Sequence, residues 1–81
     1  METLTTSKQD LNLLILKSNI KTKKDVAIVN QVFSKINAIR RWTVDLDDWE
    51  HVLKVETFIL SATNISVILE QFGYKCSELN H

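Results

Sequence analysis

Side chains that could carry metal or nucleophilic chemistry are few and lie far apart in the sequence. The chain has one cysteine, Cys76, and two histidines, His51 and His81. Thiolates and imidazoles hold soft metal ions when they are clustered at short spacing, and these three are not. A nucleophile needs a neighbouring base that a third group orients, and no glycine-rich turn presents one. We therefore expect no enzyme activity, no catalytic residue and no cofactor, with Cys76 a buried, inert thiol.

Thr22 and Asp25 have the spacing of a capping box at the start of a helix. The threonine hydroxyl can accept a hydrogen bond from the backbone N–H of Asp25, and the carboxylate can accept one from the N–H of Thr22. A stripe of apolar residues follows at intervals of three and four: Val26, Val29, Phe33 and Ile36, widened by Ile28 and Val32. This pattern predicts a helix over residues 23–36.

The candidates for an interaction site are three lysines and one tryptophan. Lys21, Lys23 and Lys24 form a basic cluster in a chain whose ten basic and ten acidic residues cancel. Such a run is typical of a solvated loop. Trp49 lies in a polar turn, where two interpretations remain open. It packs back over the hairpin, or it is exposed as a contact residue, because tryptophan is enriched at binding hot spots.

The remaining elements follow from periodicity and from turn residues. A short aliphatic run predicts a buried strand over residues 11–18, and alternation with period two predicts strands over about 38–46 and 52–57. Trp42 falls on the apolar face of the second strand and is expected in the core. Ser61 caps a second helix over 62–72, which Gly73 ends, and a last strand covers 74–79.

This order predicts an α+β, ferredoxin-like βαββαβ fold, with two helices on one face of a four-stranded antiparallel sheet in the order 4-1-3-2. A single domain over 11–79 follows a flexible leader over 1–10. One parity of the run Leu13–Leu16 faces the helices, and the other leaves an apolar patch unless it is covered. The expected core comprises Leu14, Leu16, Ile20, Val29, Phe33, Ile36, Val44, Leu53, Val55, Ile65, Ile68, Leu69 and Phe72.

Composition narrows the location and the partners. A single cysteine suits a reducing compartment, no apolar run is long enough to cross a bilayer, and residues 1–10 lack the apolar stretch of a signal peptide. We therefore expect a small soluble cytoplasmic domain without a membrane partner. A neutral chain gives no electrostatic footprint for nucleic acid. The two predicted central strands also lack the aromatics that stack RNA bases.

Together these features resemble a heavy-metal-associated domain of the copper-chaperone type. The segment Ile20–Val26 lies where that family carries M-x-C-x-x-C, and the apolar stripe of the first helix falls on its helix-core positions without a gap. Further matches are Ile39 at the start of the second strand, Val44-Asp45-Leu46 for the family's V-D-L, and Phe72-Gly73-Tyr74 for its A-G-Y. The likeness extends over Leu11–Leu79.

The resemblance implies the scaffold, whereas the two ligand cysteines are replaced by Thr22 and Asp25. In the family two thiolates bind a soft ion such as Cu(I), Zn(II) or Hg(II). A hydroxyl and a carboxylate cannot replace them for Cu(I), and Lys23 and Lys24 would repel a cation. The leading hypothesis is a non-catalytic interaction module that meets a protein partner or its own copy. The alternative is a metal chaperone or sensor that uses altered or partner-supplied ligands.

Overall fold

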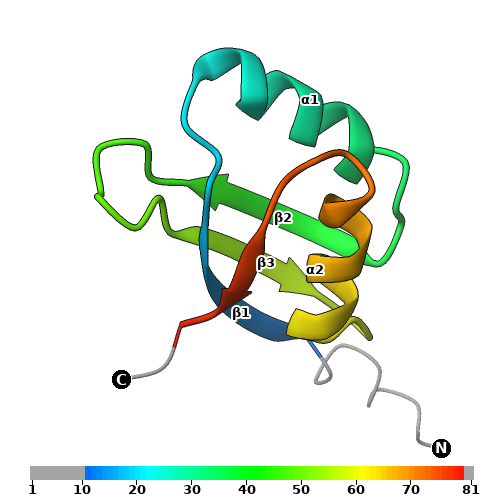
Figure 1. The fold of residues 1–81 in the computed structure, drawn as a ribbon. Helices are drawn as coiled ribbons and strands as arrows, with labels where there is room; N and C mark the ends of the chain where they lie inside the picture. The colour runs from blue at the N-terminus through cyan, green and yellow to red at the C-terminus, as the bar shows by residue number, and fades with distance from the viewer. Residues whose placement is uncertain (1–10, 80–81) are drawn as a thin grey trace, which may run out of the picture.

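A computed structural model describes residues 11–79, and the leader expected over 1–10 lies outside these residues. The chain alternates strands and helices in the expected order (Figure 1). The elements are β1 (Asn12–Ser18), α1 (Lys23–Phe33), β2 (Ile39–Val44), β3 (Leu53–Thr57), α2 (Ala62–Glu70) and β4 (Cys76–Glu78). The expected α+β class, with four strands and two helices, is confirmed. Neither helix within 11–79 has the length and apolarity that crossing a bilayer requires.

The four strands form one sheet in the order β2-β3-β1-β4, and every neighbouring pair is antiparallel. Read from the other edge, the order is β4-β1-β3-β2. Leu14 of β1 lies opposite Val55 of β3, while Ser18 at the end of β1 lies opposite Cys76. The long strand β1 is therefore central, and the three-residue strand β4 forms one edge of the sheet.

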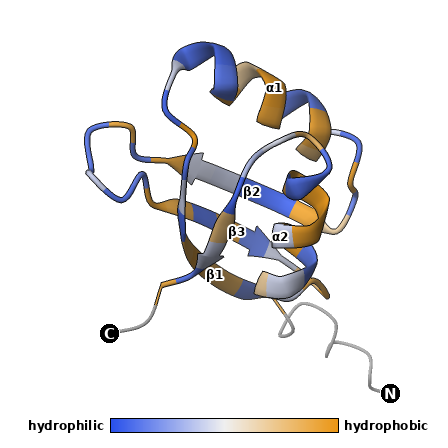
Figure 2. Cartoon of the chain, viewed as in Figure 1, coloured by the Kyte–Doolittle hydropathy of each residue, from blue (hydrophilic) through white to orange (hydrophobic). Residues whose placement is uncertain are grey.

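The core lies between the sheet and both helices. Leu16 of β1 and Leu53 of β3 are fully buried together with residues of α1 and α2, so the two helices cover the same face of the sheet. Orange and blue stretches alternate along α1 in Figure 2, as expected for an amphipathic helix. Eight of the expected core residues are buried: Leu16, Ile20, Val29, Phe33, Leu53, Val55, Ile65 and Leu69.

The face of the sheet that points away from the helices is called the open face below. Side chains alternate along a strand, so Leu14 and Leu16 point to the helices while Leu13, Ile15 and Lys17 point to the open face. Leu13 is 58% exposed. The prediction that one parity of this leucine-rich run faces outward is confirmed.

Trp42 joins the edge of the core from β2. Its ring meets Phe33 of α1 edge to face, with centroids 5.4 Å apart and an interplanar angle of 89°. This arrangement places the positive edge of one ring against the negative face of the other. Trp42 is half-buried and packs against the core, as expected. Leu14, Ile36, Val44 and Ile68, which were expected in the core, are also only half-buried.

Both helices begin at the predicted caps and end earlier than predicted. Thr22 and Asp25 form a complete capping box on α1, and Ser61 forms one with Asn64 on α2. The helix α1 ends at Phe33 rather than at residue 36. After α1, the N–H of Lys35 bonds the Val32 carbonyl, and the N–H of Ile36 bonds the Phe33 carbonyl. Because each bond reaches only three residues back, the chain tightens into turns there.

Phe72 was expected in the core and is instead 51% exposed. The helix α2 ends at Glu70, and Tyr74 N–H bonds the Leu69 carbonyl while Gly73 N–H bonds that of Glu70. These are the two hydrogen bonds of a Schellman motif, with Gly73 in the left-handed position at φ 91°. The turn leaves Phe72 exposed. Tyr74, two residues further on, is buried and belongs to the same core cluster as Leu69.

Candidate functional site

Thr22 and Asp25, which the resemblance aligns with the metal ligands of heavy-metal-associated domains, form a hydrogen-bonded helix start. The Asp25 Oδ2 atom accepts the backbone N–H groups of Lys21 at 3.2 Å and of Thr22 at 3.1 Å. Its Oδ1 atom accepts the hydroxyl of Tyr74 at 2.9 Å, from a residue that follows α2. The capping box is therefore closed by a third contact, which ties the start of α1 to the connection between α2 and β4.

These contacts set the charge states of the two residues. The Lys21 N–H, followed by the Tyr74 hydroxyl, lowers the pKa of Asp25 below its usual value, because each hydrogen bond favours the carboxylate. Desolvation, followed by the hydrogen bond to Asp25, raises the pKa of Tyr74. At neutral pH the pair is a neutral phenol that donates to a carboxylate.

The residues at these positions do not fit the soft metal ion that the family resemblance implies. Thr22 and Asp25 supply hard oxygen atoms, whereas Cu(I) prefers thiolates. Both carboxylate oxygens of Asp25 also already accept hydrogen bonds. Within residues 11–79, no three His, Cys, Asp or Glu side chains are grouped so as to hold a metal ion.

Trp49 is the most exposed large apolar residue of the described chain, with 86% of its surface accessible. The interpretation in which it packs back over the hairpin is therefore wrong. It lies in the connection between β2 and β3, where the preceding residue, Asp48, bonds the backbone that follows Trp49. The Asp48 carboxylate accepts the N–H of Glu50 at 2.8 Å, and its carbonyl accepts that of His51 at 2.9 Å. This local network holds Trp49 on a defined turn.

The same connection is attached to the end of β1. Ser18 donates its backbone N–H to the Glu50 carbonyl at 3.1 Å and its hydroxyl to the His51 carbonyl at 2.7 Å. His51 has φ 46°, in the left-handed region that non-glycine residues seldom adopt. A turn with two hydrogen bonds to a neighbouring strand can sustain such a conformation. The exposed tryptophan is thus presented by a turn that is fixed at its base.

The start of β4 is attached to β1 beside this turn. Asn19 donates its backbone N–H to the Lys75 carbonyl at 3.1 Å, and its side-chain oxygen accepts the Lys75 N–H at 2.9 Å. The reciprocal pair extends the β1–β4 ladder beyond Ser18 and Cys76. It therefore holds Lys75 on the same end of the sheet as the turn that carries Trp49.

A shallow depression of about 500 Å³ lies between these segments. We call it the Trp49 depression; its walls include Lys17, Ser18, Asn19, Trp49, Lys75 and Ser77. Two lysines and one carboxylate, that of Glu50, line it, so the balance of charge is positive. An aromatic wall beside two ammonium groups suits a ligand that combines apolar and acidic groups.

The structure brings one of the four predicted interaction residues to this depression. Lys21, Lys23 and Lys24 are exposed around the start of α1, but they are not among its walls. Sequence reasoning missed Lys17 and Lys75. Alternation along β1 places Lys17 on the open face, which could have been read from the sequence. The position of Lys75 depends on the pairing with Asn19.

Cys76 was expected to be a buried thiol and is half-buried. Desolvation raises its pKa, and only the Ser66 hydroxyl, 3.6 Å from the sulfur, acts in the opposite direction. The thiolate, which is the reactive and metal-binding form, is therefore disfavoured at neutral pH. This environment suits packing better than chemistry.

Comparisons of the chain with protein-family models, with curated proteins and with solved structures find no match.

Proposed function

We propose that this protein is a non-catalytic interaction module, built on a ferredoxin-like scaffold of the heavy-metal-associated type whose thiolate metal site is lost. The βαββαβ order and the strand order β4-β1-β3-β2 support the scaffold. The closed capping box of Thr22 and Asp25, at the positions of the family's ligands, supports the loss of the metal site. The module meets a protein partner through the Trp49 depression.

The observation that carries this proposal is the 86% exposure of Trp49 on a turn that is hydrogen-bonded to β1. A large apolar ring in water neither stabilises the fold nor improves the solubility of the free protein, so packing gives no reason for its exposure. A tryptophan on a fixed turn loses little conformational entropy on binding and buries a large area. Such residues are the usual anchors of protein interfaces.

The alternative, a metal chaperone with altered ligands, has weaker support. It would need Cys76 as a thiolate, and burial raises the pKa of that thiol. The carboxylate of Asp25 already accepts hydrogen bonds from Lys21, Thr22 and Tyr74. No contact in the described chain favours metal transport. Binding of a metal ion is therefore one of the results that would overturn the proposal.

A random heptapeptide display library, selected on the intact protein and on Trp49→Ala, tests the proposal. Trp49→Ala should leave the free energy of unfolding within about 0.5 kcal/mol of wild type, because an exposed residue is removed. Peptides selected on wild type should bind the variant at least tenfold more weakly, a loss of about 1.4 kcal/mol. Ile59→Ala, at an apolar position that is 78% exposed and does not line the Trp49 depression, is the matched control and should not change their affinity.

Two results would overturn the proposal. One is a set of selected peptides whose affinity does not depend on Trp49. The other is binding of one Cu(I) or Zn(II) per chain by the reduced, unmodified protein in native mass spectrometry. If metal binding exceeds that of an unrelated single-thiol protein, the metal chaperone replaces the interaction module.

A further inference from the structure

The outer edge of β4 carries backbone groups that do not pair with β1. The two residues that flank β4 bond to the β1 segment: the Lys75 carbonyl accepts the N–H of Asn19, which follows β1, and the Leu79 N–H bonds the Ile15 carbonyl. Ser77 lies opposite Lys17 between them. In an antiparallel pair the bonding residues alternate with residues whose N–H and C=O point the other way. The backbone groups of Cys76 and Glu78 therefore point outward, along the free edge of the sheet.

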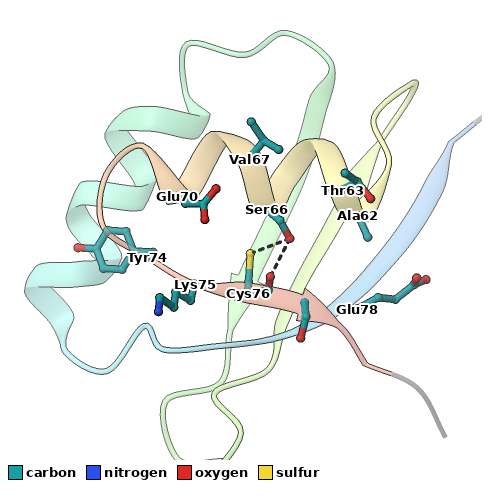
Figure 3. Close-up of a pocket in the computed structure, with 10 residues that line it drawn as sticks. Ala62, Thr63, Ser66, Val67, Glu70, Tyr74, Lys75, Cys76 and Glu78 are labelled. Carbon is teal, nitrogen blue, oxygen red and sulfur yellow. Dashed lines mark hydrogen bonds between the residues drawn. The ribbon is translucent and has the colours of Figure 1, made fainter.

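The helix α2 occupies only part of this edge. Ser66 donates its hydroxyl to the Cys76 carbonyl at 2.7 Å, so one outward acceptor has a partner within the chain (Figure 3). No residue of 11–79 forms a contact of this kind with Glu78, which is exposed. Within these residues, the N–H groups of Cys76 and Glu78 and the carbonyl of Glu78 are therefore left for another strand. Unpaired groups of this kind are a template for strand addition.

Two depressions lie on opposite sides of this one edge. The Trp49 depression is on the open-face side, and residues of α2 and β4 line a second depression of about 500 Å³ on the side that the helices cover (Figure 3). Ala62, Ser66, Val67 and Glu70 of α2 line this second depression, the α2–β4 groove. Both depressions also include Lys75, Cys76 and Ser77.

This arrangement matches the geometry of an added strand. Successive side chains of a strand project to opposite faces. One parity would therefore enter the α2–β4 groove beside Val67, and the other would lie beside Trp49 and Lys17. Main-chain bonds to an edge supply affinity, while pockets for alternate side chains supply specificity.

We propose that an extended, acidic segment of a partner protein adds to the sheet along the free edge of β4. The inference rests on the proposed function, because Trp49 borders the same edge. An acidic side chain on the open-face side complements Lys17 and Lys75. A second copy of β4 is disfavoured as the occupant because it is only three residues long and brings the same lysines to that face.

A proline substitution at the edge tests this inference. Glu78→Pro removes one outward N–H and, since that group does not bond β1, should keep the fold. The matched control Glu78→Ala keeps the N–H and removes a negative charge, so acidic peptides should bind it as tightly as wild type or more tightly. The heptapeptides selected on wild type should bind Glu78→Pro at least tenfold more weakly. Lys17→Glu should weaken them to a similar extent.

N-methylation of the selected peptide provides a second measurement that does not depend on protein variants. A methyl group on a peptide residue opposite Cys76 or Glu78 should abolish binding, and one opposite Ser77 should be tolerated, because that N–H points away from β4. In the complex, the amide protons of Cys76 and Glu78 should exchange with solvent at least tenfold more slowly than in the free protein.

The outcomes separate the two proposals. Peptides that lose affinity on Trp49→Ala but bind Glu78→Pro as they bind Glu78→Ala would overturn strand addition and leave the interaction module standing. Peptides indifferent to Trp49 would overturn both. A peptide without acidic residues could lose affinity both on Glu78→Pro and on N-methylation opposite Cys76 or Glu78. That result would overturn the inference that the partner segment is acidic. A dimer of the unliganded protein that Glu78→Pro dissociates would show that the edge belongs to a second copy, which also overturns the inference.

Discussion

Phe33 and Phe72 provide a direct test of how the helices pack on the sheet. Phe33 is 2% exposed and packs edge to face on Trp42, whereas Phe72 is 51% exposed. Truncating a buried phenylalanine costs about 3–5 kcal/mol, of which about 0.5–1.5 kcal/mol belongs to the aromatic pair. Complete burial of such a side chain stabilises by about 1.5–3 kcal/mol, so Phe72→Ala should cost about 1 kcal/mol. A domain of this size has a net stability of only about 3–5 kcal/mol, so Phe33→Ala should leave most of the molecules unfolded.

Urea unfolding at 25 °C, followed by circular dichroism and tryptophan fluorescence, measures both effects. Phe33→Leu keeps most of the apolar volume and loses the contact with Trp42. It should cost on the order of 1–2 kcal/mol, which keeps the transition measurable if the alanine variant is unfolded. A loss below about 1 kcal/mol for Phe33→Ala, or an equal loss for Phe72→Ala, would refute the placement of α1 on the sheet.

Three further predictions concern the ends of the helices. The pKa of Asp25 is lowered from 3.8 in the folded protein, so its contribution to stability is complete above that value and is lost as the pH falls through the lower folded-state pKa. The pKa of Tyr74 is raised from 10.0, so its contribution is complete below 10.0 and is lost as the pH rises through the raised pKa. Melting temperatures from about pH 2 to 12 should show both losses, Asp25→Asn should remove the acidic one, and an unchanged acid profile in that variant would contradict the assignment. The double variant Thr22→Cys, Asp25→Cys should bind one soft ion per chain in native mass spectrometry, because two thiolates restore a coordination shell. It should lose about 1 kcal/mol of stability without metal, since the cap is removed, and failure to bind would show that the loop is aligned wrongly with the family. Gly73→Ala should cost about 1–2 kcal/mol of stability in chemical unfolding, because a residue with a side chain is strained at a φ of 91°. No atom lies within 4 Å of the added methyl group, so a steric clash does not add to this cost. Gly73→Asn should cost less, as asparagine tolerates this conformation, and equal costs would argue against backbone strain as the cause.

Features that depend on residues close in sequence were predictable. The capping box needs only Thr22 and Asp25, three residues apart, and the outward parity of Leu13 follows from alternation along β1. The position of Phe72 was wrong because helical spacing was continued beyond Glu70, where the Schellman turn ends the helix. The sequence shows the glycine that makes the turn, whereas the exposure of the residue before it depends on how the turn leaves the helix.

The candidate site depends on contacts between residues far apart in sequence, which periodicity does not report. The exposure of Trp49 follows from a turn whose base is bonded to Ser18, and the place of Lys75 follows from its pairing with Asn19. Each contact requires β1 to lie between β3 and β4. The sequence indicated a tryptophan in a polar turn, and only the folded sheet decides which way it points.

The sheet order also constrains how the chain acquires its structure during synthesis. Both neighbours of β1 come late, since Leu16 pairs with Leu53 on one side and with Glu78 on the other. Of the described elements, β1, α1 and β2 leave the ribosome before β3, and β1 and β2 are not neighbours in the sheet. The leucine-rich strand therefore emerges without a partner and stays open to other nascent chains until β3 follows. Translation that stalls before Leu53 should release a fragment that depends on chaperones for its solubility.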